Sequence, residues 1–331
     1  MPAVSVVIPS YNHAAYLREC IESVIWQSFQ DWELIIVDDV SSDDSVAVAK
    51  RFTDPRIRVI ENESNLGTYA TENVGIDHSS GDWIAILNSD DVWLPRKLES
   101  QILLLQKHPQ CTFSYTGSQL MDEEGDKIAK GDGFHSDYPE GELQELLPYL
   151  LFENRVLASS LLFKRGAARF NGKLKYSGDW VALLQLAMLG PCAFVKEPLT
   201  VWRQHPENNY KQVLKVLPEE VAVREAILAK SDLWLSIAKD VPETKHRLSQ
   251  CAVALSALYV RARQMTRARQ TARLARQFDP NNPRAKTLRV LFRLVDTVGR
   301  RQFWRSADKL VLTPHLSVEE VLADLNTQEY P

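Results

Sequence analysis

Apolar runs and helical patterns alternate through the N-terminal part of the chain. Four segments predict strands, at 4–9, 32–39, 57–62 and 82–91, and the apolar runs of the first two predict buried strands of a parallel sheet. Three intervening segments have the patterns of helices, at 13–28, 43–52 and 68–79. This alternation predicts an α/β domain whose sheet carries helices on both faces.

The pattern becomes less regular in the middle of the chain. A helix is expected over 95–108, a strand with a hairpin turn over 112–125, and short apolar elements over 156–205. The segment 126–150 contains three glycines and no clear periodicity. We expect it to form a mobile loop.

After about residue 215 the strand patterns end, and Ala, Leu and Arg recur at helical spacing. We therefore expect an α/β domain at 1–214 and an all-helical domain at 215–331. Six positions also match the spacing of a single 34-residue tetratricopeptide repeat: Leu255, Ser256, Tyr259, Ala268, Ala275 and Pro280. No second copy follows in register, so this weak match predicts a helical hairpin and no solenoid.

The charge of the chain is unevenly distributed. Its 331 residues are 45% hydrophobic and 25% charged, which excludes disordered and fibrous classes. The net charge of the whole chain is −4. The section from Arg261 to Lys309 contains twelve Arg, two Lys and three Asp, a net charge of +11, so the rest of the chain carries −15. This basic section is either a solvated helical face or a surface for an anionic membrane, a lipid-linked phosphate or an acidic partner. No nucleic acid partner is expected.

Cysteine usage and the chain's start predict a reducing compartment. The four cysteines form no CxxC pair, which is typical of scattered thiols and not of a disulfide framework or zinc site. The first residues, MPAVSVVIPS, lack a basic leader, and no apolar stretch approaches the length of a membrane span. We expect a cytoplasmic protein, with peripheral contact at the inner face of the plasma membrane as an option.

Polar clusters follow three of the predicted strands. They are SYN at 10–12, the pair Asp38–Asp39 and NSDD at 88–91. Ligands of open α/β sheets bind beyond the carboxyl ends of the strands, so these clusters are candidate site residues. Asp90 and Asp91 would repel each other unless a cation or hydrogen bonds keep them ionised, and Mg²⁺ or Mn²⁺ suits such oxygen ligands. The alternative is that NSDD only caps the next helix.

Two further side chains at these strand ends suit a nucleotide. Asp39 could accept a hydrogen bond from a nucleobase N–H or a ribose hydroxyl, and Tyr11 could stack on a base. Taken singly, each has a simpler explanation as part of a strand end or a cap. No Walker loop, GxGxxG, HExxH or GxSxG motif is present.

Six motifs together resemble family 2 glycosyltransferases of GT-A fold. They are VSVVIPSYN at 4–12, VDDVSSDDS at 37–45, NLGTYATENVGI at 65–76, GDWIAILNSDDVWLP at 81–95, SGDW at 177–180 and VWRQH at 201–205. The resemblance covers about residues 1–210 in the family's order and spacing. It implies a GT-A (Rossmann-like) mixed sheet flanked by helices. It also implies sugar transfer from a nucleotide diphosphate, with UDP the leading candidate, to an acceptor hydroxyl.

The resemblance assigns donor-binding roles to the strand-end residues. Tyr11 would flank the uracil, with Pro9 shaping the first turn, and Asp39 would hydrogen-bond the uracil ring. Asp90 would lie near the ribose and the metal. The other positions implied at the donor are Asn65, Gly67, Asn73 and Asn88.

The resemblance also assigns the metal ligands and the base. Asp90 and Asp91 end the family's DxD-type motif, and Asp91 would bind Mn²⁺ or Mg²⁺ at the diphosphate. His205 matches a histidine that in many relatives closes over the diphosphate or reaches the metal. Asp179 of SGDW matches the catalytic base, which removes the proton of the acceptor hydroxyl in a single inverting displacement.

Three positions depart from the family's pattern. Asn88 stands where relatives often have Asp, so the metal set has one charge fewer. Glu72 stands where many have Arg, which puts the donor-phosphate contacts around Asn73 in question. Val40 stands where Gly is common, so we expect that turn to form without a positive φ.

We expect a transferase of cell-surface polysaccharide or glycoconjugate synthesis. Two other functions are alternatives. One is a non-catalytic nucleotide-sugar-binding scaffold that acts through its helical C-terminal domain. The other is a nucleotidyltransferase, which would need a basic, glycine-rich loop that SYNHAAYLR is not. The acceptor could be a glycan, a lipid-linked glycan or a protein, and 126–150 could order over the donor as a lid.

Overall fold

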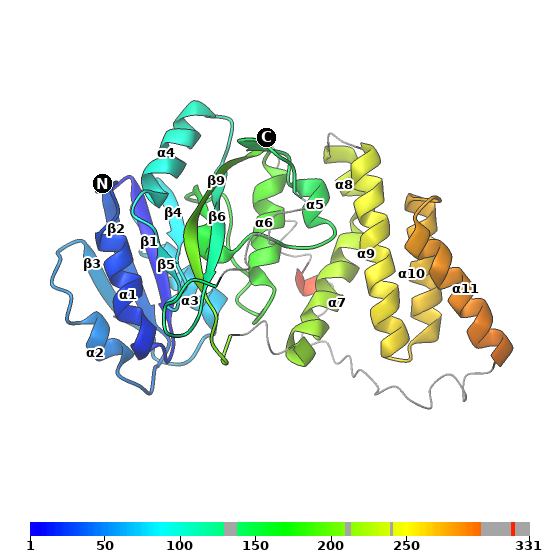
Figure 1. The fold of residues 1–331 in the computed structure, drawn as a ribbon, viewed down its shortest axis with the longest axis horizontal. Coiled ribbons are helices and arrows are strands. Elements are labelled where there is room, and N and C mark those ends of the chain that lie inside the picture. Colours follow the sequence, from blue (N-terminus) through cyan, green and yellow to red (C-terminus); the bar gives the residue numbers. More distant parts are fainter. Residues whose placement is uncertain (129–137, 209–212, 239–240, 299–318, 322–331) are drawn as a thin grey trace. The chain divides into compact units, whose positions relative to one another are not determined.

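The computed structural model describes residues 1–128, 138–208, 213–238, 241–298 and 319–321 (Figure 1). These residues fall into two compact units. The first comprises Met1–Leu146 and Arg155–Lys211, and the second comprises Leu147–Asn154 and Gln212–Glu329, each as far as it is described.

Four parallel strands form one half of the sheet in the first unit. They are β1 (Val4–Ser10), β2 (Trp32–Asp38), β3 (Ile57–Glu61) and β4 (Trp83–Ile86), in the spatial order β3-β2-β1-β4. Every residue of β1 is buried, as its continuous apolar run predicts for a central strand. The strand predicted over 82–91 ends at Ile86, so its polar end lies in the loop that follows.

The other half of the sheet makes it mixed, as predicted. The strand β8 (Leu162–Lys164) runs antiparallel to β4 and to β6 (Phe113–Met121), and β9 (Cys192–Arg203) runs parallel to β6. Two short strands, β5 (Val92–Trp93) and β7 (Leu143–Gln144), pair antiparallel with β9. The turn after β6 closes the expected hairpin through a bridge between Met121 and Lys127.

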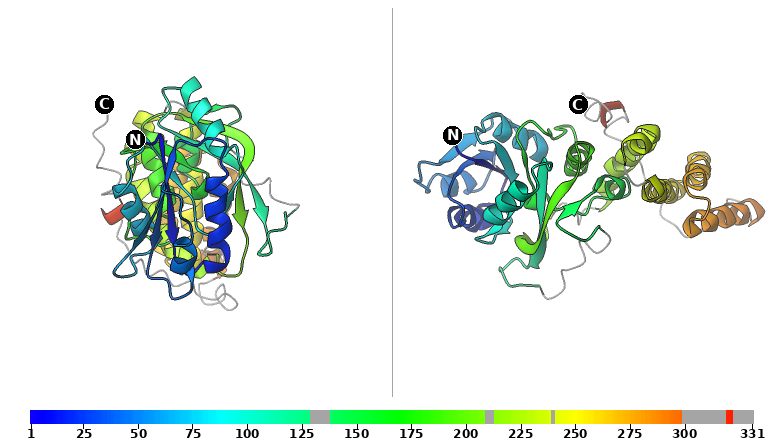
Figure 2. Two further views of the ribbon diagram at one scale, coloured as in Figure 1. Left: turned by 90° about the vertical axis from the view of Figure 1, so that its left-hand side faces the viewer. Right: turned by 90° about the horizontal axis from the view of Figure 1, so that it is seen from above.

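Helices cover both faces of the sheet. On one face, Val6 and Ile8 of β1 share a core cluster with α1 (Ala14–Ile25) and α4 (Lys97–Lys107). On the other face, α3 (Thr68–Asp77) approaches so closely that a Cβ on Gly75 would lie 2.3 Å from Val7 Cγ1. Two further helices are α2 (Ser45–Ala49) and α6 (Gly178–Met188). The left view of Figure 2 shows α1 running alongside the strands.

The segment 126–150 is not one long loop. Its second half contains β7, which pairs with β9, and the short helix α5 (Leu147–Leu150), whose leucines at both ends are buried. Residues 129–137 lie outside the described part of the chain. The proposed lid therefore stays a prediction.

The second unit consists of helices. After α5 come α7 (Val213–Ala229), α8 (Ser231–Ile237), α9 (Val241–Arg261), α10 (Met265–Phe278) and α11 (Pro283–Val298). None of the helices in the described ranges is both long and apolar enough to cross a membrane.

The predicted helical hairpin is formed by α9 and α10, which run side by side (Figures 1 and 2). Small residues lie where the two helices touch, and their hydroxyls bond across the contact. Ser256 Oγ donates to the Ala268 carbonyl oxygen (2.7 Å), and Ser249 Oγ donates to that of Ala275 (2.8 Å). Asn282 then caps α11 through its side-chain oxygen. The tetratricopeptide repeat itself stays a prediction.

Candidate functional site

The carboxyl ends of β1, β2 and β4 meet at one edge of the sheet. Ser10 pairs with Asp38, and the Asp39 N–H donates to the Ser10 carbonyl oxygen over 2.8 Å. After β4, Ser89 Oγ lies 2.7 Å from Nδ1 of His13, which follows β1. The polar clusters that follow these three strands are therefore neighbours in space.

The turns after β1 and β2 each contain a residue in the left-handed region. Asn12 has a φ of 53° and Val40 a φ of 66°. The prediction that the turn at Val40 forms without a positive φ is therefore wrong. The sharp turn imposes this conformation on a β-branched side chain, at a cost of about 1–3 kcal/mol. Asn12 braces the turn, because its Oδ1 accepts from the Ser42 N–H (2.7 Å) and its N–H donates to Ser41 Oγ (3.0 Å).

The carboxylate of Asp39 holds the loop that leads into α3. Its Oδ1 accepts from the Leu66 N–H (2.8 Å) and from Asn62 Nδ2 (2.9 Å), and its Oδ2 accepts from the Gly67 N–H (2.8 Å). Its backbone oxygen accepts from Asn65 Nδ2 (3.0 Å). An ionised carboxylate has about four acceptor positions. Three are occupied, which leaves one acceptor position on Asp39.

The other residues expected at the donor have different surroundings. Tyr11 is 50% exposed just beyond β1, whereas Pro9 is buried within that strand. Asn88 lies in the loop after β4 and is partly buried. The side chain of Asn73 is committed elsewhere, because it donates to the Phe170 carbonyl oxygen (2.7 Å) and accepts from the Phe170 N–H (3.1 Å). The structure thus brings Tyr11 and Asn88 to the strand ends and gives Asn73 a structural contact.

Three side chains that can bind a metal converge beside these strand ends. Ligand atoms of His13, Asp90 and His205 all lie within 4.8 Å of one another, and this is the one such group in the described part of the chain. Nε2 of His205 lies 3.0 Å from Asp90 Oδ2, and the two imidazole rings meet edge to face, with 5.7 Å between their centroids. His205 follows β9, where its N–H donates to Asn208 Oδ1 (2.6 Å).

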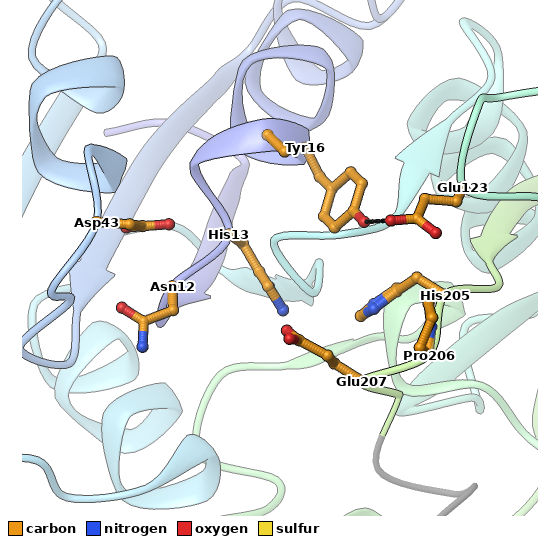
Figure 3. Close-up of a pocket in the computed structure, with 9 residues that line it drawn as sticks. Asn12, His13, Tyr16, Asp43, Glu123, His205, Pro206 and Glu207 are labelled. Carbon is orange, nitrogen blue, oxygen red and sulfur yellow. Dashed lines mark hydrogen bonds between the residues drawn. The ribbon is translucent and has the colours of Figure 1, made fainter.

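A polar cavity of about 230 Å³ opens beside these imidazoles (Figure 3). Its lining includes Tyr16 from α1, whose hydroxyl donates to Glu123 Oε1 over 3.1 Å. The sequence analysis gave His13 no role. The sequence does contain a hint of such a role, because His13 directly follows the SYN cluster at the end of a predicted strand, where ligands of such sheets bind.

Asp91 lies outside this group of ligands, although the resemblance implied it as a metal ligand together with Asp90 and His205. It is 1% exposed, its Oδ1 accepts from the Arg203 N–H (3.1 Å), and its Oδ2 accepts from Ser159 Oγ. Burial and the charge of Asp90 raise the pKa of Asp91 well above its usual value. Its two oxygens thus tie the strand-end loop to β9 and to the turn that contains Ser159.

The Asp90 carboxyl has the opposite electrostatic character. Burial by itself would raise its pKa, but the hydrogen bond with His205 and the charges of His13 and His205 outweigh burial and lower it. Of the two adjacent aspartates, Asp90 is therefore the one that stays ionised beside the imidazoles. An ionised carboxylate is the form that binds a metal.

The predicted base, Asp179, lies in the first turn of α6. Its Oδ1 accepts from the Tyr69 hydroxyl (3.3 Å) and from the Trp180 N–H (2.8 Å). Gly178 permits this approach, since a Cβ there would lie 2.5 Å from the Tyr69 ring. The N-terminal end of a helix stabilises a negative charge, which favours the ionised form that a base requires.

One turn after Tyr69 on α3 lies Glu72, whose surroundings the sequence did not predict. Its side chain is fully buried, and neither carboxylate oxygen has a hydrogen-bond partner among the described residues. Burial, and then the charge of Asp179, raise the pKa of Glu72 well above its usual value. Both effects favour the neutral form of the Glu72 carboxyl.

Sequence comparisons place these residues among known proteins. Residues 5–127 match the family described as "Glycosyl transferase family 2". An uncharacterized glycosyltransferase of Rickettsia typhi, RT0329, is 31% identical over 69% of this chain and 72% of its own length. The putative teichuronic acid biosynthesis glycosyltransferase TuaG of Bacillus subtilis is 38% identical over 39% of this chain and 52% of its own.

A third relative has a more specific name. The Escherichia coli protein WfgD, a UDP-Glc:alpha-D-GlcNAc-diphosphoundecaprenol beta-1,3-glucosyltransferase, is 36% identical over 36% of this chain and 46% of its own length. The chain thus spans about half the length of several of the curated relatives that it matches.

Solved structures share the fold at low sequence identity. Residues 1–349 of S. aureus TarS in complex with UDP-GlcNAc superpose with a TM-score of 0.55 at 17% identity, over 83% of this chain and 91% of that one. The mannosyltransferase PcManGT from Pyrobaculum calidifontis, in complex with GDP-Man and Mn2+, gives 0.52 at 15% identity, over 99% and 88%. The α/β unit has the GT-A fold of these glycosyltransferases. From these matches, and above all from the extent of the match to the Rickettsia protein, the chain belongs to glycosyltransferase family 2.

Proposed function

We propose that this protein is a metal-dependent, inverting glycosyltransferase that moves a sugar from a UDP-sugar to an acceptor hydroxyl in cell-surface polysaccharide synthesis. The observation that carries the proposal is that Asp39 and the Asp90–His205 pair both lie at the same edge of the sheet. Asp39 has one acceptor position left. A nucleotide and a divalent ion can both be held there, beyond the carboxyl ends of the strands.

UDP is the proposed nucleotide of the donor. The remaining acceptor position of Asp39 suits the N–H of a uracil ring, and the exposed Tyr11 offers a ring face on which a base can stack. The name of WfgD includes UDP-Glc, and the TarS structure contains UDP-GlcNAc. PcManGT was solved with GDP-Man, so a guanine nucleotide is the alternative to test.

Asp90 and His205 would hold the metal ion. A carboxylate oxygen and an imidazole nitrogen, 3.0 Å apart at one edge of a polar cavity, are ligands that Mn²⁺ accepts. When bound, a divalent ion stabilises the negative charge that develops on a leaving diphosphate. Asp91 then has a supporting role, because it fixes the strand-end loop against β9.

Asp179 would act as the base. Held by Tyr69 and the first turn of α6, it would take the proton of the acceptor hydroxyl while that oxygen attacks the anomeric carbon. A positioned base contributes about 10²–10⁴-fold to the rate. A single displacement inverts the configuration at that carbon.

A glycan attached to a lipid diphosphate is the proposed acceptor, as the name of WfgD describes for that relative. Such an acceptor resides at a membrane, which favours a peripheral location at the inner face of the plasma membrane. The helical domain, 215–331 in the predicted division, would then contact the membrane or a protein of the same pathway.

The test is a transfer assay with a panel of UDP-sugars, Mn²⁺ and lipid-linked or polysaccharide acceptors, with NMR of the anomeric proton of the product. We expect a β-linked product from an α-linked donor. The Asp179→Asn variant should lose transfer but still bind UDP. A retained α configuration, or near-normal turnover of the variant, would contradict the mechanism. UDP binding without turnover on any acceptor would favour the non-catalytic scaffold.

A further inference from the structure

We infer that His13 is a third protein ligand of the metal ion, and that it makes the site bind Mn²⁺ before any nucleotide and in preference to Mg²⁺. This inference rests on the proposed function and extends it. It concerns which ion the enzyme uses and in which order the ion and the donor bind.

The geometry suits one ion held by three side chains. Nitrogen and oxygen ligands lie about 2.0–2.2 Å from ions of this kind, so two ligands of a common ion are at most about 4.4 Å apart. The ligand atoms of His13, Asp90 and His205 already lie within 4.8 Å of one another without an ion. Small rotations of the side chains close that difference.

His13 is oriented for this role by its neighbours. Its Nδ1 pairs with Ser89 Oγ at 2.7 Å, which leaves Nε2 as the nitrogen that can bind an ion. Its backbone N–H donates to Ser45 Oγ (3.1 Å), so the residue is fixed against the first turn of α2. Ser89 directly precedes Asp90, and one short segment therefore positions both an imidazole and a carboxylate.

The other imidazole of the group, that of His205, is also held in place by its neighbours. His205 is 3% exposed, and the Asn208 side chain fixes its backbone. In Figure 3 the side chains of His13, His205 and Glu207 point toward one another. Glu207 also lines the cavity of about 230 Å³.

The chemistry of these ligands selects the ion. Mg²⁺ prefers oxygen ligands and retains its water, whereas imidazole suits first-row transition metals such as Mn²⁺. Two imidazoles and one carboxylate therefore favour Mn²⁺ over Mg²⁺. A site with a single protein carboxylate depends on the diphosphate for further ligands. With three protein ligands, an ion can bind without the diphosphate.

The competing explanation is a hydrogen-bonded network with no metal role for His13. In that case the 2.7 Å contact with Ser89 and the packing against His205 would only stabilise the strand-end loops. The two explanations differ in what happens to free Mn²⁺ in the absence of nucleotide.

The test uses the full chain and electron paramagnetic resonance of free Mn²⁺, titrated without nucleotide. We expect one Mn²⁺ per chain, at least about tenfold weaker binding in His13→Gln, and displacement by Mg²⁺ only at a large excess. Ser89→Ala should weaken binding by about 10–100-fold, as loss of a partner that orients a ligand does. His78→Gln, an exposed histidine on the C-terminal side of α3, is the matched control and should bind like the wild type.

Three results would overturn the inference: no Mn²⁺ binding by the wild type without nucleotide, equal affinity of wild type and His13→Gln, or equal competition by Mg²⁺. Thermal unfolding of each variant shows whether it is folded. A parallel titration with UDP separates the two proposals. Mn²⁺ binding without any nucleotide binding would contradict the proposed function, whereas metal-dependent UDP binding that is unchanged in His13→Gln would contradict only this inference.

Discussion

Two pairs of adjacent aspartates lie at strand ends on either side of β1, one at the end of β2 and one after β4, and their surroundings differ. The pair after β2 is surrounded by neutral donors: Asp38 accepts from the N–H and Oγ of Ser41, and Asp39 accepts from the loop before α3. In the pair after β4, only Asp91 is satisfied in this way. Asp90 instead faces two imidazoles.

This difference shows how a carboxylate's neighbours separate a structural role from a ligand role. A carboxylate whose oxygens accept from backbone N–H groups and hydroxyls holds a turn or loop together. We propose that a carboxylate beside two imidazoles, as Asp90 is, serves as a metal ligand. In the same proposal Asp39 combines the two roles, because it holds a loop and has one acceptor position left. The predictions below test this division from the largest expected effect to the smallest.

The largest contrast is expected between Asp90→Asn and Asp91→Asn. The first removes the ionised ligand beside His205, so kcat/KM with a UDP-sugar and Mn²⁺ should fall by about 10²–10³-fold, since charge stabilisation by a metal is worth several kcal/mol. The second keeps an oxygen for the Arg203 N–H and should cost less than about tenfold. Steady-state kinetics of both variants at several Mn²⁺ concentrations measure the contrast. A larger loss in Asp91→Asn would return the metal role to Asp91.

Asp39→Asn should destabilise the fold by about 1–3 kcal/mol. The amide replaces one acceptor oxygen with a donor, so either the Gly67 N–H or the Leu66 N–H loses its charged partner. Urea unfolding of the variant, with Asp38→Asn as the matched variant at the same strand end, checks the value. UDP affinity should fall in Asp39→Asn and remain near the wild-type value in Asp38→Asn, and equal losses in both would contradict the role of Asp39.

Glu72 extends the comparison to a carboxyl with neither neutral donors nor imidazoles around it. Its pKa in the folded protein is raised above that in the unfolded chain. The folded protein therefore keeps a proton that the unfolded chain loses above about pH 4.3. The free energy of unfolding should thus fall as pH rises from that value toward the raised pKa, by up to about 1.4 kcal/mol per pH unit from this group.

Glu72→Gln should remove this contribution, because the amide does not titrate. Denaturant unfolding of wild type and variant between pH 5 and pH 8 would show a difference that grows in favour of the variant as pH rises. A difference that stays constant with pH would mean that Glu72 does not carry the proton. The same two proteins would show whether Glu72 affects the pH dependence of transfer through Asp179.

The smallest expected effect concerns the turn after β2. Val40→Gly relieves a positive φ at a β-branched residue, worth about 1–3 kcal/mol, and adds about 0.5–1 kcal/mol of chain entropy to the unfolded state. The variant should be more stable by about 1 kcal/mol, as thermal unfolding would show. Val40→Ala keeps the positive φ on a residue with a Cβ and should gain less. Equal stability of all three proteins would mean that the turn is unstrained.

Much of the fold could be predicted from the sequence, because central strands such as β1 and β2 are buried and leave apolar runs. The four parallel strands, the helices on both faces and the helical C-terminal unit follow from such patterns. The short strands β5 and β7 could not be predicted, since two residues have no periodicity. They form only because β9 offers an edge for them.

The position of the candidate site could be predicted from the sequence, but the contacts of its individual side chains could not. Polar residues after β1, β2 and β4 meet because parallel strands end at one edge. Which carboxylate faces the imidazoles depends on the turn geometry after β4, and the loop hydrogen bonds of Asn73 and Asp91 depend on partners far away in the chain. The positive φ of Val40 could not be predicted either, because the fold imposes a conformation that a β-branched residue disfavours.

The most direct test of the central claim is isothermal titration of UDP into the wild-type protein with Mn²⁺ and, separately, with chelator. The account predicts UDP binding that is strong with Mn²⁺ and weakened at least about tenfold by the chelator, because Asp90 and His205 would hold the ion against the diphosphate. Equal affinity under both conditions would contradict the metal site. No UDP binding in either would contradict the donor site.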